Sequence, residues 1–378
     1  MRALKPAPLS VLLGLALSLS TAAKATVIYS DDSSSLDLFG SVSALCLSGH
    51  AAHPDRPYGN AAADSAIASR SIVGLAMRSR LGDHLDAIAM AQWDMTNGEL
   101  DSATDYLYTG IDAYEYGTLI AGQAENAYYA VVGTTDIFHF LESRGNDAYF
   151  MDDKLPGQLL YRFSALSYDL RLSYMTSKDQ VNDTPFSVSH QIAASVSGRV
   201  SDRISFAYGL VYTNFSYAGA DNRQALGNYF GSLLARDYNW SESEAERRAL
   251  SSHKIEAKYD YGAALSYGVL GEGLYASVNF TVSDYDYLKH KIYSTEGAVS
   301  YTFDNGMELL GGLNFEHYDG FCVISDLNLG AAWNLAPSFK VFCEGTVDLG
   351  ADPERFYGSA VSDYLTENKF VLGAEFSF

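Results

Sequence analysis

The chain has 378 residues, of which 46 are acidic and 25 basic, and its formal net charge is −21. So large an excess of negative charge disfavours electrostatic binding of nucleic acid, and no nucleic-acid partner is expected. After the first 25 residues no segment has the roughly 18 uninterrupted apolar residues of a membrane helix, so the chain is predicted either to be exported in soluble form or to cross a membrane as strands.

Residues 1–25, "MRALKPAPLSVLLGLALSLSTAAKA", have the pattern of a secretory signal peptide. A basic start with Arg2 and Lys5 is followed by a Leu-rich run and by small residues ending at Ala25. A membrane anchor is the alternative, but the apolar run is only about 12 residues long and a span needs about 20. The predicted domains are therefore a signal peptide, 1–25, and a mature domain, 26–378. Cleavage removes three positive charges (Arg2, Lys5 and Lys24), so the net charge becomes −21 − 3 = −24.

Many segments of the mature domain alternate strictly between apolar and polar residues, which is typical of strands with one apolar and one polar face. In "LYASVNFTVS", residues 274–283, Val278 and Phe280 share one face, and Asn279 and Thr281 share the other. The segments "GMELLGGLNFE" (306–316) and "FVLGAEFSF" (370–378) sort in the same way. The pattern predicts an all-β fold.

The lengths of these segments and of their connections distinguish between two all-β architectures. A soluble sandwich has strands of about 5 to 6 residues, whereas the alternating runs here often reach 10 or more. Short connections at 201–203, 304–306 and 336–338 interleave with long polar ones, as in 48–66 and 216–252. With 28 Tyr and 19 Phe to form aromatic girdles, this predicts a transmembrane antiparallel β-barrel of about 16 strands, wide enough to enclose an aqueous channel.

The segment "DIFHFLESRGNDAYFMDDKLPG", residues 136–157, is too long and too charged to be a hairpin turn. It contains five acidic and two basic residues. The segments before and after it resemble a known family. The start of the mature domain, "TVIYSDDSSSLDLFGSVSAL", and the terminal Phe378 are similar to the ends of the general trimeric porins of Gram-negative outer membranes, the osmoporin type. Similarity recurs at 91–95 ("AQWDM"), 117–138 ("GTLIAGQAENAYYAVVGTTDIF") and 154–163 ("KLPGQLLYRF").

The resemblance implies that 136–157 is the third outer loop, which in such porins folds into the barrel and narrows the channel. Members of the family carry acids on this loop and basic residues on the facing wall. Asp136 in "TTDIF" matches one loop acid, and Glu142 matches the second with one inserted residue. Asp147 is a third candidate acid on the loop.

On the facing wall, Lys154 falls where the family has an Arg, and Asp94, after Trp93, falls on an acid that faces the channel. Ser41, Ile72 and Gln123 stand where basic residues are usual, so this part of the wall is expected to be less basic. Arg70, Arg78 and Arg80 share the face of Ile72 by their period of two. They could rebuild a basic wall, or they could lie near the rim or a turn.

The resemblance also implies the partners: a homotrimer embedded in outer-membrane lipid and lipopolysaccharide, with ions and small hydrophilic solutes passing through by diffusion. Outward Val42, Ala44 and Cys46 and the segment 87–93 offer small apolar side chains for subunit contacts. A cation preference is expected. The alternatives are a channel specific for sugars or peptides and a structural or adhesive barrel.

No catalytic, cofactor or metal site is predicted. The sequence contains neither HExxH nor a GxSxG nucleophile turn, and the eight His residues are scattered. His50 and His53 in "GHAAH" form a pair without a third ligand. Cys46, Cys322 and Cys343 are odd in number and show no CxxC spacing, so they are interpreted as small apolar side chains on strands, although one disulfide is also compatible with export.

Overall fold

The computed structural model describes residues 25–48, 65–96, 104–141, 154–177, 187–216, 233, 236–238, 241, 257–286, 288–357 and 365–378. The strands are β1 (Thr26–Ser30), β2 (Ser34–Ser48), β3 (Ser65–Gly82), β4 (Leu85–Thr96), β5 (Thr104–Asp112), β6 (Thr118–Glu125), β7 (Lys154–Ala165), β8 (Tyr168–Met175), β9 (Ser187–Arg199), β10 (Ile204–Ser216), β11 (Ala257–Val269), β12 (Glu272–Tyr285), β13 (Ile292–Thr302), β14 (Met307–Tyr318), β15 (Phe321–Ala336), β16 (Phe339–Asp348) and β17 (Lys369–Ser377). The short helical turns that lie entirely within these described ranges are η2 (Tyr114–Tyr116), α1 (Tyr129–Val132) and α4 (Glu354–Tyr357).

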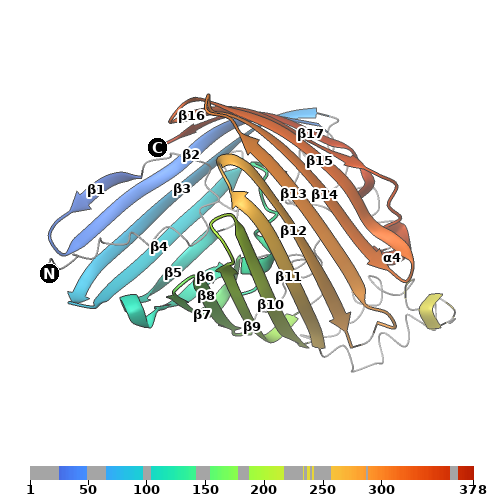
Figure 1. The fold of residues 1–378 in the computed structure, drawn as a ribbon, viewed down its shortest axis with the longest axis horizontal. Helices are drawn as coiled ribbons and strands as arrows, with labels where there is room; N and C mark the ends of the chain where they lie inside the picture. Colours follow the sequence, from blue (N-terminus) through green and yellow to red (C-terminus); the bar gives the residue numbers. More distant parts are fainter. Residues whose placement is uncertain are drawn as a thin grey trace.

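Strands β2 to β17 form one antiparallel barrel, in which each strand pairs with its neighbours in the sequence (Figure 1). The barrel closes where the last strand meets the first, with Ser377 of β17 opposite Ser41 of β2. Backbone hydrogen bonds join Gly40 and Phe378 in both directions, at N···O distances of 3.0 and 2.9 Å. The prediction of a closed barrel of about 16 strands is confirmed.

Alternating side chains explain why these strands close around a polar interior. In β12, Asn279 and Thr281 point inward and are each 1% exposed, whereas Val278 and Phe280 point outward and are 45% and 48% exposed. Apolar side chains outside and polar side chains inside are the arrangement of a barrel that lies in a membrane. A soluble protein has the reverse distribution of apolar and polar side chains. Among the described residues no helix is long and apolar enough to span a membrane.

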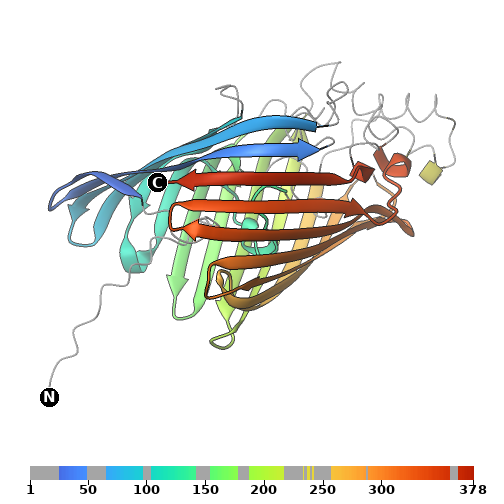
Figure 2. The same ribbon diagram turned by 90° about the horizontal axis from the view of Figure 1, so that it is seen from above.

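The two ends of the barrel differ in their connections, and Figure 2 shows β1, in dark blue, and the C-terminus toward the same end. At this end, called the turn end below, the connections between barrel strands are two to five residues long. At the other end, the loop end, they range from two residues, Asp319 and Gly320, to the forty residues 217–256. The predicted alternation of short and long connections is confirmed, except at the tight turn between β14 and β15.

Strand β1 is not part of the closed barrel. It pairs with β2 alone, from Thr26 opposite Leu38 to Ser30 opposite Ser35, and projects from the turn end (Figure 1). It therefore occupies the edge of β2 beyond the point where β17 ends. Asp31 holds the turn between β1 and β2, because its carboxylate accepts hydrogen bonds from the backbone N–H groups of Ser33 and Ser34, both at 2.7 Å.

The three cysteines lie on three strands, Cys46 on β2, Cys322 on β15 and Cys343 on β16, and all are free thiols. The sequence-based interpretation of unbridged residues on strands is confirmed.

Candidate functional site

The chain enters the barrel interior immediately after β6. Asn126 donates from Nδ2 to Oε1 of Gln191 on β9, at 3.0 Å. Ala127 is held on both sides of its backbone: its N–H donates to Ser173 Oγ of β8 at 2.9 Å, and its carbonyl accepts from Ser195 Oγ of β9 at 2.6 Å. The polar residues that alternation places inside the barrel thus serve as hydrogen-bonding partners for an inserted segment, called the inner segment (residues 126–141) below.

Helix α1 of the inner segment packs against a wall of very small side chains. Tyr128 and Val131 are fully buried, in a cluster with Ala193 of β9, Ala207 of β10 and Ala264 of β11. Gly209 and Gly262 face the same ring: a Cβ on Gly209 would lie 2.9 Å from Tyr128 Cδ2, and one on Gly262 would lie 2.9 Å from Tyr128 Cζ. Only glycine leaves room for the aromatic ring at these two strand positions.

The next residues of the inner segment follow the wall across β12 to β14. Thr135 donates from Oγ1 to Glu296 Oε2 of β13 at 2.7 Å and accepts from Asn279 Nδ2 of β12 at 2.8 Å. The hydroxyl of Tyr275 donates to the carbonyl of Thr134 at 2.6 Å. Phe138 then lies over β14, where a Cβ on Gly312 would approach its ring to 2.9 Å.

A single carboxylate on β16 holds the end of the described inner segment. Glu344, 1% exposed, accepts three backbone hydrogen bonds, from His139 N–H at 2.6 Å, Phe140 N–H at 3.0 Å and Leu141 N–H at 2.9 Å. The His139 ring lies between Lys340, with Nδ1 and Nζ 3.1 Å apart, and Glu308, with Nε2 and Oε2 3.4 Å apart.

The inner segment reaches the first strands of the barrel at its far end. Leu141 packs with Leu45 and Leu47 of β2 and Ala68 of β3, and the Phe140 ring centroid is 5.9 Å from Arg70 Cζ. From Asn126 to Leu141 the chain therefore contacts the interior wall at β8 to β14, at β16 and finally at β2 and β3. Figure 2, a view from above, shows α1, in teal, within the outline of the barrel. The inner segment narrows the interior over this depth.

The comparisons with known proteins agree with this architecture. No family model matches the chain. It is 23% identical to Outer membrane porin C 2 of Shigella flexneri serotype 5a (strain M90T) over 379 residues, which cover 94% of this chain and 95% of that protein. Along almost its whole length the chain is therefore similar to an outer-membrane porin. The resemblance predicted from its ends and motifs is thereby confirmed.

Solved structures show the same fold at low sequence identity. Salmonella typhi OmpF, in a complex with daunomycin, matches with a TM-score of 0.70 and 13% identity, covering 93% of this chain and 100% of that one. Vibrio cholerae OmpT in its trimer form gives a TM-score of 0.60 and 13% identity, with coverage of 92% and 100%. A mutant porin of Rh. blastica gives 0.58 and 15%, with coverage of 91% and 100%. In porins the short turns face the periplasm and the longer loops face outward, so the turn end is periplasmic.

Among the predicted loop acids, Asp136 lies in the inner segment. It is half-buried, and its Oδ2 accepts a hydrogen bond from the Tyr129 hydroxyl at 2.9 Å. Glu142 and Asp147 lie outside the described residues, and their role stays a prediction. The inserted part of the chain begins before the predicted loop. The prediction started it at Asp136, whereas the chain enters the barrel at Asn126.

The predicted wall residues lie on β3, β4, β6 and β7. Arg70 of β3 forms a charge pair with Asp94 of β4, with Arg70 Nε 2.7 Å from Asp94 Oδ2. Gln123 donates to the carbonyl of Thr104, and Lys154 lies with Nζ 5.7 Å from the Tyr106 ring centroid. Arg78 is bound to two acids, Asp86 on β4 and Asp112 on β5. Arg80 is exposed, two residues from the end of β3.

The sequence analysis did not identify two sets of charged residues in the barrel interior. On β7 and β8, Arg162 and Arg171 both contact Asp169, each at 3.0 Å. On β11 to β17 the buried interior charges are mainly acidic. They are Asp260, Glu296, Glu308, Glu316, Asp326 and Glu344, against Lys258, Lys340 and Lys369. The period-two alternation could have assigned these residues to the interior, but nothing in the sequence indicated their height in the barrel.

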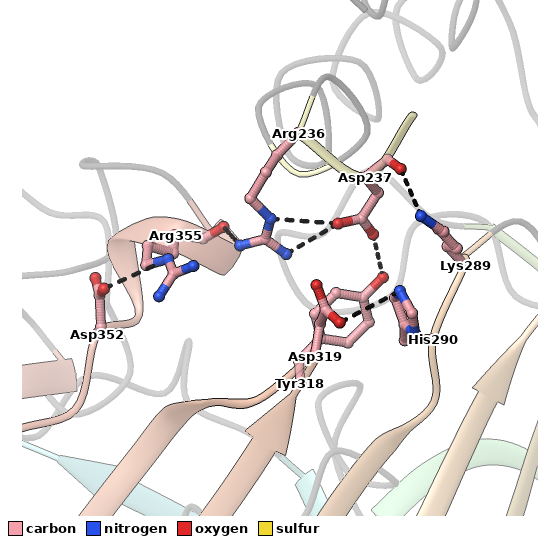
Figure 3. Close-up of polar contacts among 8 residues, drawn as sticks. All are labelled: Arg236, Asp237, Lys289, His290, Tyr318, Asp319, Asp352 and Arg355. Carbon is pink, nitrogen blue, oxygen red and sulfur yellow. Dashed lines mark hydrogen bonds and ion pairs between the residues drawn. The ribbon is translucent and has the colours of Figure 1, made fainter. Parts of the chain in front are cut away.

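The loop end of the barrel, called the outer rim below, has its own polar cluster (Figure 3). Asp237, whose side chain is fully buried, accepts hydrogen bonds from the Tyr318 hydroxyl and from Arg236, and its backbone carbonyl accepts one from Lys289 Nζ at 3.0 Å. The Arg236 guanidinium lies 4.7 Å from the Phe321 ring centroid, and that of Arg355 lies 4.3 Å from the same centroid. This cluster fastens residues 236–238 to the rim formed by β13, β14, β15 and α4.

Proposed function

We propose that this porin is a water-filled channel through which ions and small hydrophilic solutes diffuse passively, with a preference for cations. The observation that supports the proposal is the inner segment, which is held against the interior wall by polar contacts from β8, β9, β12, β13, β14 and β16 and narrows an otherwise open barrel. A polar tube through the hydrocarbon layer removes the cost of dehydrating a small solute, so passage needs neither an energy source nor a chemical step.

Fixed negative charge supports the preference for cations. The interior wall of β11 to β17 is acidic, and Asp136 adds a carboxylate on the inner segment itself. In a narrow passage with low-dielectric walls, such charges raise the local concentration of cations and repel anions. One unit charge acts on an ion about 8 Å away with roughly 2 kcal/mol at an effective dielectric near 20. Energies of this size bias the passage of ions without trapping them.

The proposal includes the assembly and the processing of the chain. Residues 1–25 act as a cleaved signal peptide, and the mature domain 26–378 assembles as a homotrimer in outer-membrane lipid and lipopolysaccharide. The trimer form of OmpT supports the assembly, as do Val42, Ala44 and Cys46, which are exposed on the outer face of β2. The function needs no cofactor and no enzymatic step, which agrees with the porin relatives.

Reversal potentials across a planar bilayer in a KCl gradient test the proposal. The wild-type protein should conduct and should prefer potassium over chloride. The double variant Asp136→Asn with Glu142→Gln should lose much of this preference, and Asp304→Asn, in an exposed turn at the periplasmic end, should keep it. A double variant with wild-type selectivity would show that these two acids do not line the narrow part of the channel.

A further inference from the structure

A β-bulge on β5 places an additional carboxylate among the wall charges. In the ladder between β4 and β5, Gln92 pairs with Tyr106 and Trp93 pairs with Thr104, so Asp105 has no opposite residue on β4. The extra residue of a bulge leaves the strict alternation of its strand, and its side chain points in a direction that the pleat would not provide. By period-two alternation with Tyr106 and Tyr108, which face inward, Asp105 would face the lipid.

The structure instead turns Asp105 toward interior groups. Its Oδ2 accepts a hydrogen bond from Nε2 of Gln92, a buried interior residue of β4, at 2.8 Å. Its charge interacts with those of Lys154, Asp94 and Arg70. A bare carboxylate in the hydrocarbon layer would be costly, and the bulge avoids this cost by directing the group inward.

These charges form a small group that we call the wall patch: Arg70, Asp94, Asp105, Glu125 and Lys154. Within it each base already has an acid on the neighbouring strand, because Arg70 is bound to Asp94 and Lys154 is opposite Glu125 in the ladder of β6 and β7. Asp105 is the third acid beside two bases. Phe140 of the inner segment contacts Arg70, so the wall patch lies at the depth where the barrel is narrowed.

We infer that Asp105 is a selectivity-determining residue of the channel, because it adds one negative charge to the wall that faces the passage. This inference rests on the proposed channel function. Cations are thus favoured from the wall as well as from the inner segment, and the preference does not depend on the loop acids alone.

The variant Asp105→Asn isolates the charge, because an Asn oxygen can still accept the hydrogen bond from Gln92. In bilayers with a KCl gradient at about 0.1 M salt, the ratio of potassium to chloride permeability should fall by about two- to threefold. At about 1 M salt, where the screening length is about 3 Å, the difference should shrink. Asp105→Glu should keep the wild-type ratio. The matched control is Asp284→Asn, which removes an equal charge from the partly exposed pair with Lys291 near the outer rim and should change nothing.

The outcomes separate this inference from the proposed function. If the wild type prefers cations but Asp105→Asn has the same permeability ratio, the inference is wrong and the channel function stands. Equal shifts in Asp105→Asn and Asp284→Asn would also overturn it, because they would show a general charge effect. A wild-type protein without cation preference would contradict the proposed function and this inference together. If Asp105→Asn does not insert, Asp105→Ser provides the same comparison.

Discussion

Tyr128 of the inner segment lies directly against Gly262 of β11, with its Cζ 2.9 Å from the position that a Cβ at residue 262 would take. The hydroxyl of Tyr128 would be closer still. A glycine in the middle of a transmembrane strand weakens β propensity, so its presence here is explained by the close approach of the ring. The position of the inner segment thus depends on a missing methyl group in the wall.

This contact predicts the effect of Gly262→Ala. The added methyl group must displace Tyr128 and with it helix α1, at a cost of about 1 to 3 kcal/mol for an overpacked site. We expect a lower thermal unfolding midpoint in detergent and an altered single-channel conductance. Gly297→Ala is the control, since a Cβ there meets nothing within 4 Å. Adding Tyr128→Phe to Gly262→Ala should restore part of the conductance by removing the closest atom. Equal behaviour of the two alanine variants would contradict the assignment.

The three hydrogen bonds to Glu344 lead to a second prediction. In Glu344→Gln an NH₂ group replaces one of the two acceptor oxygens and faces a backbone N–H, so at least one buried donor loses its partner. We expect a loss of about 1 to 3 kcal/mol and partial release of residues 139–141 from β16. Single-channel recordings should show additional current fluctuations that are absent from Glu272→Gln, an exposed position at the periplasmic end. A quiet channel of wild-type stability would show that this carboxylate does not hold the inner segment.

The barrel architecture could be predicted from the sequence because the side chains along each strand point alternately to the inside and to the outside of the barrel. Asn279 and Val278 could be assigned to opposite faces from their order alone, and the long charged stretch from Asp136 marked the connection that does not stay outside. The family resemblance then placed that connection in the interior.

The pairing of interior charges could not be predicted in the same way. The contact of Arg70 with Asp94 depends on the register of β3 against β4, and a one-residue change in register would turn every side chain to the other face. Asp105 is an example, since its direction follows from a bulge that no pattern in the sequence marks. Gly209 and Gly262 did carry a signal, because an isolated glycine within a strand indicates a close backbone approach, but they do not reveal that Tyr128 is the partner.

The turn between β1 and β2 provides a prediction about pH. Hydrogen bonds to Asp31 from the Tyr29 hydroxyl, and then from Ser33 and Ser34, hold the pKa of Asp31 well below its ordinary value of about 4. A group whose pKa is depressed in the folded state stabilises the fold above its unfolded pKa, and this contribution is lost as the pH falls through the folded pKa. The turn should therefore remain intact at pH 4.

NMR titration of the Ser33 and Ser34 amides, which donate to this carboxylate, measures the effect. Their midpoint should lie clearly below pH 4 in the wild type and should rise in Tyr29→Phe, which removes the first of these hydrogen bonds. Tyr116→Phe, in another periplasmic turn, serves as the control. An unshifted wild-type midpoint near pH 4 would contradict the assignment of these contacts.

The cluster at the outer rim leads to the last prediction. Asp237 is buried and depends on Tyr318 and Arg236 for its hydrogen bonds, so Tyr318→Phe leaves a buried carboxylate with one donor fewer (Figure 3). Loss of a hydrogen bond to a charged, buried group costs about 1.5 to 3 kcal/mol, which is enough to release residues 236–238 from the rim in a measurable fraction of molecules.

Limited trypsin digestion measures this release directly, because trypsin cleaves the peptide bond after Arg236. In the folded protein the guanidinium of Arg236 is held against Phe321. We expect cleavage after Arg236 to be several times faster in Tyr318→Phe than in the wild type. Tyr301→Phe, which removes a hydroxyl from an exposed position on β13, should leave the rate unchanged. Equal rates in all three proteins would show that the segment is fastened to the rim by something other than the hydrogen bond from Tyr318 to Asp237.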